Sequence, residues 1–433
     1  MQVQHSVSLH VYHVMHDAIR VHKNRRVPSR TMPPSSRTDI TDIYHADTDT
    51  TGVVVTGASG YVGGAIVSFL LAKTSVPRVH ATVRGDVNAP RYAALRSLDP
   101  VGLRLRVFSA DLETPGAFDE PCRDCSAIIH VAAPTTIRCR KPKQAYERMI
   151  DPAIKGVENV VSSVEKMGLR TMVLTSSMAA VQGDGWERGP GHVYTEEDWN
   201  DLNATPEKNS YACMKVQTER RCLDLFDGRE VRDVRGKAEA RSSWERLVVL
   251  CPGLVLGAPS TDVRSEWVDF VTLLMQGKIW PVIPNYEFSM VHLEDVAKAH
   301  VLAAIGKVGE LNAPSRYILA AGDRTLGMTG LVCGRLKEGV RTRIESREGS
   351  RIKYTSALRW PMGAAPRWIL RVLSWFMDSV QWPLVEAHLD KPSRFDGGKI
   401  VREVEGFGAY LDPVDGFLEL LEWIVDERSA LQR

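Results

Sequence analysis

The chain lacks a long hydrophobic run. Nowhere in its 433 residues do about 18 apolar residues follow one another, whereas a membrane-spanning helix needs about 20. We therefore expect no integral membrane segment. The nearest candidate, residues 360–382, is interrupted by Arg367, Arg371 and Asp378. Its pattern predicts an amphipathic helix over a pocket or at a lobe interface, and leaves a peripheral membrane contact open.

An excess of one charge is also absent. The sequence sets 55 Lys and Arg against 53 Asp and Glu, a net charge of +2. This balance gives no reason to expect nucleic acid as a partner. Cysteine is scarce as well, because seven scattered residues in a chain of this length do not form a disulfide framework. Such a set is typical of a reducing compartment, and we expect a cytoplasmic protein.

Metal ligands do not occur at useful spacings. Cys122-x-x-Cys125 is the only close cysteine pair, and no second pair or histidine cluster accompanies it. Structural zinc sites need typically four Cys or His ligands, so no metal is predicted.

Residues 1–50 differ from the rest of the chain. They hold six of the twelve histidines, and up to Arg37 a single acid, Asp17, stands against six Lys and Arg. An arginine-rich, acid-poor start partly resembles an organelle transit peptide. A disordered tail, or a true start at Met32, is the favoured interpretation.

From residue 51 onward, strand-like and helix-like segments alternate. The predicted strands are residues 53–56, 79–84, 103–107, 127–131, 171–175 and 247–250. Repeated βα units imply a parallel sheet with helices on both faces. We therefore predict a Rossmann-type, doubly wound α/β domain over 51–255, interrupted by a charged insertion at 227–246. Residues 256–433 are predicted to form mainly a smaller substrate-binding lobe, interleaved with late Rossmann elements.

A glycine-rich turn follows the first predicted strand. Gly57, Gly60 and Gly63 have the spacing G-x-x-G-x-x-G and lead into an apolar helix. Backbone N–H groups and the helix dipole at such a turn bind a dinucleotide pyrophosphate. Ser59, Tyr61 and Val62 belong to the same turn and are predicted cofactor contacts.

A tyrosine and a lysine stand four residues apart at Tyr211 and Lys215. On a helix they share one face, where the ammonium stabilises a phenolate and makes the tyrosine a usable proton donor. Upstream, a serine segment at 176–177 ends the fifth predicted strand, where a hydroxyl can orient a substrate carbonyl.

In this order, the motifs resemble those of the extended short-chain dehydrogenases/reductases. The branch most similar is that of dihydroflavonol and cinnamoyl-CoA reductases, in the NAD-dependent epimerase/dehydratase superfamily. The resemblance covers roughly 51–426 and rests on segments 56–63, 81–84, 110–112, 130–134, 176–177, 193–199, 211–215, 252–257 and 291–297.

The resemblance implies a role for each matching residue. Tyr211 would protonate the nascent alkoxide, Lys215 would also bind the nicotinamide ribose, and Ser177 rather than Ser176 would orient the carbonyl. Asp111 and Leu112 would line the adenine, Ala132 the cofactor cleft, and the segment from Pro252 to Val255 the carboxamide end. His292 is expected to be structural, as are the helices within 394–423.

Arginine after the second strand indicates the cofactor. An acid there binds the ribose of NAD, whereas arginine accommodates the 2′-phosphate of NADP. Arg84 ends this strand and Arg91 follows. NADP(H) is therefore the preferred cofactor, with NAD(H) as the alternative.

The sequence thus predicts a monomeric or homodimeric NADPH-dependent reductase of a ketone or aldehyde on a mid-sized apolar substrate. Alternatives are a 3β-hydroxysteroid or sterol dehydrogenase, a sugar-nucleotide epimerase or dehydratase, and a non-catalytic nucleotide sensor. Gln182 and four aromatic residues of the lobe are candidates for the substrate side: Trp267, Trp280, Tyr286 and Phe288.

Overall fold

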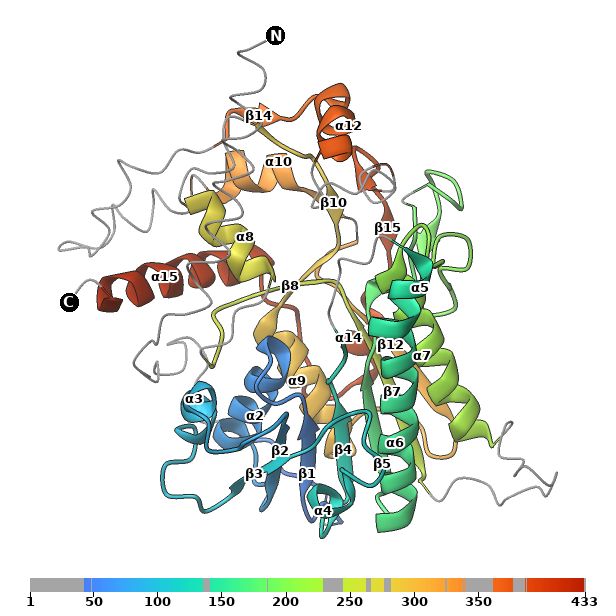
Figure 1. The fold of residues 1–433 in the computed structure, drawn as a ribbon, viewed down its shortest axis with the longest axis vertical. Helices are drawn as coiled ribbons and strands as arrows, with labels where there is room; N and C mark the ends of the chain where they lie inside the picture. The colour runs from blue at the N-terminus through green and yellow to red at the C-terminus, as the bar shows by residue number, and fades with distance from the viewer. Residues whose placement is uncertain are drawn as a thin grey trace.

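A seven-stranded parallel sheet forms the base of the molecule (Figure 1). The computed structural model describes residues 43–47, 49–134, 141–184, 186–228, 244–261, 266–275, 282–323, 325–336, 338, 361–376, 386 and 388–431. The strand order is β12-β7-β5-β4-β1-β2-β3. The strands are β1 (Val53–Thr56), β2 (Val79–Val83), β3 (Leu105–Ser109), β4 (Ala127–His130), β5 (Thr171–Thr175), β7 (Arg246–Pro252) and β12 (Pro314–Leu319).

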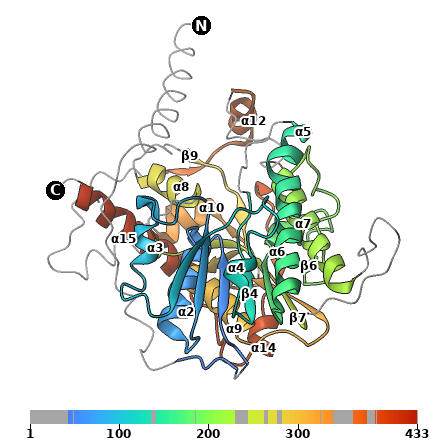
Figure 2. The same cartoon turned by 60° about the horizontal axis from the view of Figure 1, so that its bottom comes forward.

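Helices cover both faces of this sheet (Figure 2). One face carries α2 (Tyr61–Lys73), α3 (Ala93–Arg96) and α9 (Leu293–Ala304), and the other carries α4 (Asp119–Cys122), α6 (Asp151–Met167) and α7 (Ser210–Asp227). The central strands are buried on both sides, which explains their continuous runs of apolar and β-branched residues. The predicted doubly wound α/β fold is confirmed.

The chain reverses its direction of winding between β1 and β4. It runs outward through β2 and β3, then returns to lay β4 beside β1, with Thr56 opposite His130. In parallel sheets, ligands bind beyond the carboxyl ends of the strands at such a switch point. The glycine turn after β1 therefore lies at the edge where a cofactor is expected.

A separate set of elements lies beyond this edge and forms the lobe. It comprises β8 (Leu254–Leu256), α8 (Glu266–Met275), β9 (Val282–Ile283), β10 (Glu287–Phe288), β11 (Met290–His292), β13 (Leu326–Gly327), α10 (Met328–Gly330), η4 (Leu331–Leu336), β14 (Gly363–Ala364), α12 (Arg367–Phe376) and α15 (Pro413–Leu431). Its own core contains Leu256, Val271, Met290, Phe417 and Trp423. Two short elements link it to the sheet domain: β15 (Arg394–Phe395), which pairs with β6 (Val193–Tyr194), and α14 (Lys399–Glu403).

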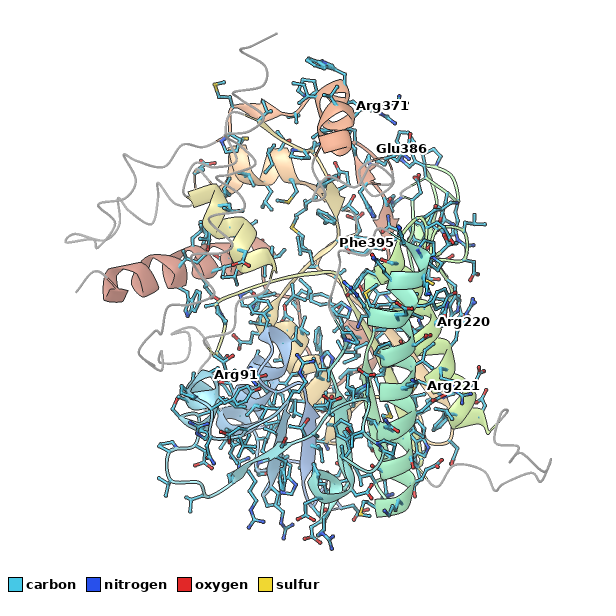
Figure 3. All side chains as sticks on the ribbon, in the orientation of Figure 1. Arg91, Arg220, Arg221, Arg371, Glu386 and Phe395 are labelled. Carbon is cyan, nitrogen blue, oxygen red and sulfur yellow. The ribbon has the colours of Figure 1, made fainter. Side chains whose placement is uncertain are left out.

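The predicted amphipathic helix within 360–382 corresponds to α12. Leu370 is buried against Ala365 and Leu389, whereas Trp368 stays 69% exposed. Arg371 and Glu386 lie in this outer part of the lobe (Figure 3). Residues 360 and 377–382 fall outside the described part of the chain.

Several element boundaries differ from the sequence prediction. The third strand begins at Leu105 rather than 103, because Asp99 Oδ2 accepts the N–H groups of Arg104, at 2.7 Å, and Leu105, at 2.9 Å, and holds a turn before the strand. The strand β12 was not predicted. The charged insertion is shorter than 227–246, since α7 continues to Asp227 and Trp244 is buried against Phe226; residues 229–243 lie outside the described part.

The predicted tail also ends earlier than residue 50. Tyr44 N–H donates to Lys73 O at 2.8 Å, and the Tyr44 ring stacks on Phe69. Asp47 pairs with Lys307 at 2.8 Å, and Asp49 with Arg170 at 2.7 Å. Residues 43–47 therefore belong to the folded unit, and residues 1–42 lie outside the described part.

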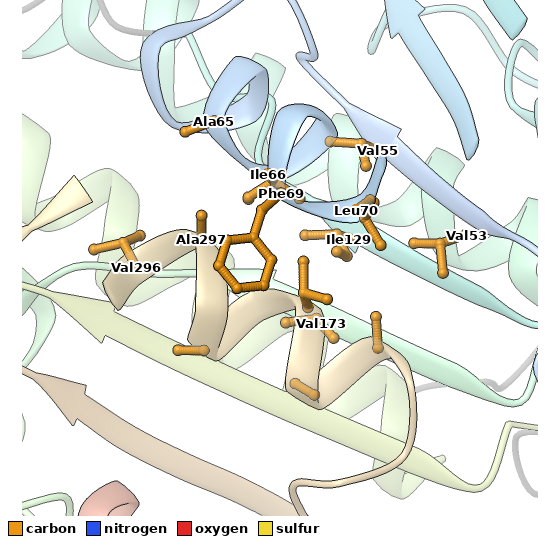
Figure 4. Packing of buried hydrophobic residues seen from close by; sticks show 14 of the residues in the cluster. Val53, Val55, Ala65, Ile66, Phe69, Leu70, Ile129, Val173, Val296 and Ala297 are labelled. Carbon is orange, nitrogen blue, oxygen red and sulfur yellow. The ribbon is translucent and has the colours of Figure 1, made fainter. Parts of the chain in front are cut away.

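The largest core cluster joins α2 and α9 to the sheet (Figure 4). Phe69 is only 8% exposed and packs in this cluster with Ile66, Val173 and Ala297. Removing a buried aromatic ring costs about 3–5 kcal/mol. We expect Phe69→Ala to lower the free energy of unfolding by that amount in urea titrations. Leu103→Ala, at a side chain that is 80% exposed, is the control and should change it by less than about 0.5 kcal/mol.

A buried carboxyl group makes the stability depend on pH. Asp295 is 3% exposed, and its Oδ2 accepts the N–H of Leu411 at 2.8 Å. Burial raises the pKa of Asp295 to about 6, above the value of about 3.9 in unfolded chains. The folded protein therefore holds this proton more tightly. The resulting stabilisation is complete below about pH 4 and is lost as the pH rises through 6.

Asp295→Asn removes this titration and keeps an acceptor for Leu411. Between pH 4 and pH 7, we expect wild-type protein to lose about 2–3 kcal/mol more unfolding free energy than the variant in urea titrations. Equal losses in the two proteins would show that Asp295 titrates like a surface carboxylate.

Candidate active site

The turn after β1 has no room for side chains at two of its glycines. Gly57 has φ +64°, and a Cβ there would lie 2.9 Å from Ala132 Cα. A Cβ on Gly63 would lie 2.9 Å from the carbonyl carbon of Gly57. The helix α2 begins directly after Gly60, and no side chain caps its first turn. Backbone atoms pack closely at this turn, and no side chain bonds the first N–H groups of α2. Pyrophosphate binding at a helix start uses such N–H groups.

A threonine hydroxyl ties this turn to the loop after β4. Thr56 Oγ1 accepts the N–H groups of Val131 and Ala132, both at 3.1 Å. It lies 2.9 Å from His130 Nδ1, so its own proton is donated to that nitrogen. Gly57 and Ala132, both predicted cofactor contacts, are therefore brought together at the switch point.

Arg84 extends from the end of β2. Its carbonyl oxygen accepts Arg91 Nη2 at 2.9 Å and the Tyr92 hydroxyl at 2.6 Å, which fixes the loop. Arg91 lies in the short helix η1 (Pro90–Tyr92) that leads into α3 (Figure 3). Within the described part of the chain, the exposed Arg84 guanidinium has no hydrogen-bond or ion-pair partner, so it is available to an anion.

The end of β3 lies next along this edge. Asp111 Oδ1 accepts the N–H of Glu113 at 2.9 Å, and Leu112 O accepts Asn159 Nδ2 at 2.7 Å. Leu112 also packs against α6 at Gly156, where a Cβ would lie 3.1 Å from the leucine side chain. The two predicted adenine-side residues thus belong to an ordered turn after β3 that is held against α6.

Tyr211 and Lys215 occupy the first turns of α7. Asn209 caps this helix through Oδ1, which accepts the N–H of Ala212 at 3.0 Å. Lys215 Nζ lies 5.9 Å from the centroid of the Tyr211 ring and donates to Thr175 O, the last residue of β5, at 2.9 Å. The lysine thereby joins the tyrosine helix to the strand that leads to Ser177.

Two neutral histidines flank this lysine. Burial lowers the pKa of His130 to about 3 and that of His300 to about 4, and the Lys215 charge acts in the same direction in both. His300 Nδ1 donates to Val296 O at 2.7 Å, and its Nε2 accepts the Thr175 hydroxyl at 2.8 Å. Neither imidazole therefore adds a positive charge near Lys215.

The two candidate serines have different environments. Ser176 is buried, and its hydroxyl donates to Glu219. Ser177 is partly exposed, and its Oγ accepts the N–H of Ala179 at 3.1 Å, at the start of η3 (Met178–Ala180). The Ser177 proton stays available to a substrate oxygen, whereas that of Ser176 is already bonded.

The segment from Pro252 to Val255 runs from the sheet into the lobe. Gly253 N–H donates to Leu319 O at 2.9 Å, and Val255 pairs with Val291. Just beyond it, Gly257 O accepts the Tyr61 hydroxyl at 2.5 Å. The first residue of α2 therefore contacts the residue that directly follows β8.

The predicted substrate side is only partly described. Gln182 is buried at the end of the turn that begins at Ser177, where its N–H donates to Met178 O at 2.8 Å. The rings of Tyr286 and Phe288 lie 5.9 Å apart. The side chain of Trp267 and all of Trp280 lie outside the described residues. His292 is buried and accepts the N–H of Glu294 at 3.1 Å, a structural helix cap.

Sequence reasoning missed two charged residues next to the serines, Glu219 and Arg316. Glu219 follows Lys215 by four residues and so lies on the Tyr211 face of α7, a signal that the sequence contained. Arg316 comes from the unpredicted strand β12 and carried no such signal.

Neither a membrane span nor a metal cluster is found in the residues that the structure describes. None of the described helices is long and apolar enough to cross a bilayer. The same part of the chain contains no group of three or more His, Cys, Asp or Glu that could hold a metal ion.

Comparisons with known proteins agree with this architecture. The model of the 3-beta hydroxysteroid dehydrogenase/isomerase family matches residues 54–311. A cinnamoyl-CoA reductase of Medicago truncatula is 32% identical over 253 residues, which cover 58% of this chain and 71% of that protein. A dihydroflavonol 4-reductase of Gerbera hybrida is 28% identical over 281 residues, 63% of this chain and 69% of that protein.

Solved structures share the fold. Yeast methylglyoxal/isovaleraldehyde reductase, complexed with NADPH, superposes with a TM-score of 0.63 at 19% identity, covering 88% of this chain and 99% of that one. Vestitone reductase from alfalfa (Medicago sativa) gives 0.59 at 20% identity over the same shares of 88% and 99%. The resemblance drawn from the motifs is confirmed: the chain belongs to the 3-beta hydroxysteroid dehydrogenase/isomerase family, among the extended short-chain dehydrogenases/reductases, and is an NAD(P)-dependent oxidoreductase.

Proposed function

We propose that this protein reduces a ketone or aldehyde on a mid-sized apolar molecule, with NADPH as cofactor and Tyr211 as proton donor. One observation carries the proposal. The Lys215 ammonium bonds the end of β5 at Thr175 and acts electrostatically on His130 at the end of β4. These contacts support a site at the carboxyl ends of β4 and β5, beside the serine segment. The names of the relatives, reductases of cinnamoyl-CoA and dihydroflavonol, support the same class.

The residues present fit a dinucleotide. The absence of Cβ atoms at Gly57 and Gly63 leaves a backbone-lined turn at the first turn of α2. Gly60 is the N-cap of that helix, Ser59 precedes it, and Tyr61 and Val62 are the first two residues of the helix. Arg84 would hold the 2′-phosphate by a bidentate contact. Asp111, Leu112, Ala132, Pro252 and Val255 are the other proposed contacts. When bound, the reduced nicotinamide supplies the hydride.

The chain's own residues would handle the carbonyl oxygen and the proton. Ser177 would donate its free hydroxyl hydrogen to the substrate carbonyl. Tyr211 would give its phenolic proton to the oxygen as the carbonyl carbon is reduced, so that the alcohol leaves neutral. Lys215 would stabilise the phenolate that remains and bind the ribose. It would keep its hydrogen bond to Thr175 O, which is 2.9 Å from Nζ.

A second candidate follows from the matched family. Its description names 3-beta hydroxysteroid dehydrogenase/isomerase, so oxidation of a 3β-hydroxyl group is the alternative. Assays of NADPH oxidation with aldehydes, flavonoid-like ketones and keto-steroids, and of NAD⁺ reduction with 3β-hydroxysteroids, separate the two. Faster oxidation of hydroxysteroids than reduction of any carbonyl would favour the alternative.

Arg84→Ala tests the cofactor. Loss of a charge-assisted contact of about 1.5–3 kcal/mol should raise the KM for NADPH roughly 10- to 100-fold. The KM for NADH should change less than about twofold, because NADH has no 2′-phosphate. Arg106→Ala, at another exposed arginine on β3, is the control and should leave both constants unchanged. Equal effects of Arg84→Ala on both cofactors would rule out the assignment.

Tyr211→Phe tests the proton donor. It should lower kcat by about 10²- to 10⁴-fold on every accepted carbonyl, the usual contribution of general acid catalysis. NADPH binding, followed by cofactor fluorescence, should persist because the ring remains. Tyr44→Phe, on the far side of α2 where the hydroxyl contacts Gly406, is the matched control. Full activity of Tyr211→Phe would favour a mechanism with another proton donor.

A further inference from the structure

One face of α7 carries a third polar residue beyond the tyrosine and the lysine. Tyr211, Lys215 and Glu219 follow at intervals of four residues and so lie on the same side of the helix. Lys215 donates to Thr175 O at 2.9 Å, and the fully buried Glu219 accepts the hydroxyl of Ser176. Successive turns of α7 therefore hold successive residues at the end of β5, directly before Ser177.

The Glu219 carboxylate is paired with an arginine from the edge strand. Arg316 Nε lies 2.6 Å from Glu219 Oε1. The same guanidinium donates through Nη1 to Glu196 O at 2.8 Å and Asp198 O at 2.6 Å, and Nη2 lies 3.5 Å from Ala180 O. Ala180 ends the short helix that begins at Ser177. Arg316 thus connects α7 and β12 with the Ala180 end of the serine turn, and Glu219 holds the other end through Ser176.

An indole ring completes this cluster. The Trp199 ring has Arg316 Cζ 4.1 Å from its centroid and Arg220 Cζ 4.9 Å from it. The next residue, Asn200, is fully buried; its N–H donates to Ala180 O at 3.0 Å and its Nδ2 to Ala179 O at 2.8 Å. The loop after β6 therefore holds the serine turn through the same arginine and through its own amide.

A buried ion pair of this kind contributes little to stability. The cost of removing both charges from water offsets their attraction, and an apolar pair of similar size is often as stable. What the pair does supply is geometry, because a planar guanidinium presents its donors in a fixed fork that accepts few other arrangements of its partners. The pair joins α7 to β12, and it reaches the turn that carries Ser177 through Ser176 and Ala180.

We propose that Glu219 and Arg316 are positioning residues, which fix the register of α7 against the end of β5 and thereby align Tyr211 and Lys215 with Ser177. The effect on catalysis rests on the proposed function. The effect on the position of α7 rests on the contacts alone. Neither residue reaches the reacting atoms; each acts through Ser176, Ala180 or the helix.

The test replaces the pair by apolar residues, in Glu219→Leu/Arg316→Met. We expect an unchanged melting temperature within a few degrees, an unchanged Kd and KM for NADPH within about twofold, and a kcat lowered roughly 10- to 100-fold by misalignment. Ser176→Ala, which removes only the hydroxyl bonded to Glu219, should lower kcat in the same direction without loss of stability. If the double variant does not fold, this second variant decides. Full kcat in a folded double variant, or in Ser176→Ala, would overturn the proposal.

A control variant and a second measurement separate this proposal from the proposed function. Arg221, adjacent to Arg220 on α7 (Figure 3), pairs with Glu158 of α6 at 2.7 Å, away from β5. Arg221→Gln should leave kcat unchanged. Hydrogen exchange of residues 176–181 should be at least about 10-fold faster in Ser176→Ala and in the double variant, and unchanged in β1. Unchanged exchange in 176–181 would overturn the positioning role even if no carbonyl is reduced, whereas a wild-type protein inactive on every carbonyl would overturn the function alone.

Discussion

The close approach of the turn after β1 to the loop after β4 is the contact on which the rest of the site depends. Gly57 can approach Ala132 this closely because it has no side chain. It also adopts a positive φ angle, which favours glycine. The Thr56 hydroxyl then joins the two loops through two amide hydrogens and one imidazole. The contact lies at the switch point of the sheet, where ligands bind in such folds. The first turn of α2 follows directly after it.

The opposite side of the site is built by α7. Its docking is fixed by polar groups that are buried rather than by apolar packing alone: the lysine on Thr175 and the glutamate on Ser176. Burial and the Lys215 charge lower the pKa of two histidines, His130 of β4 and His300 of α9, so both imidazoles are neutral. The nucleotide side and the proposed chemical side thus meet through a few buried side chains at the ends of β4 and β5.

Much of the fold could be read from the sequence, because buried parallel strands leave continuous apolar runs. The strand β12 escaped because the sequence PSRYIL, with Arg316 inside it, does not form such a run. The arginine is tolerated there because Glu219, two carbonyl oxygens of the loop after β6 and the Trp199 ring surround it. The start of the third strand was predicted too early because Asp99 accepts the backbone N–H groups of Arg104 and Leu105. Strand propensity does not reveal such a side-chain contact.

The sequence by itself determined the order of the elements, the glycine turn, and the family to which the chain belongs. It also supplied Arg84, Ser177, Tyr211 and Lys215 as candidates, because each stands at a fixed place within a local motif. The tertiary structure added the physical difference between the two serines, a hydrogen bond from Ser176 to a residue 43 positions away. It alone revealed Glu219 and Arg316 as a pair, because contacts between residues 97 positions apart arise from packing and leave no local pattern.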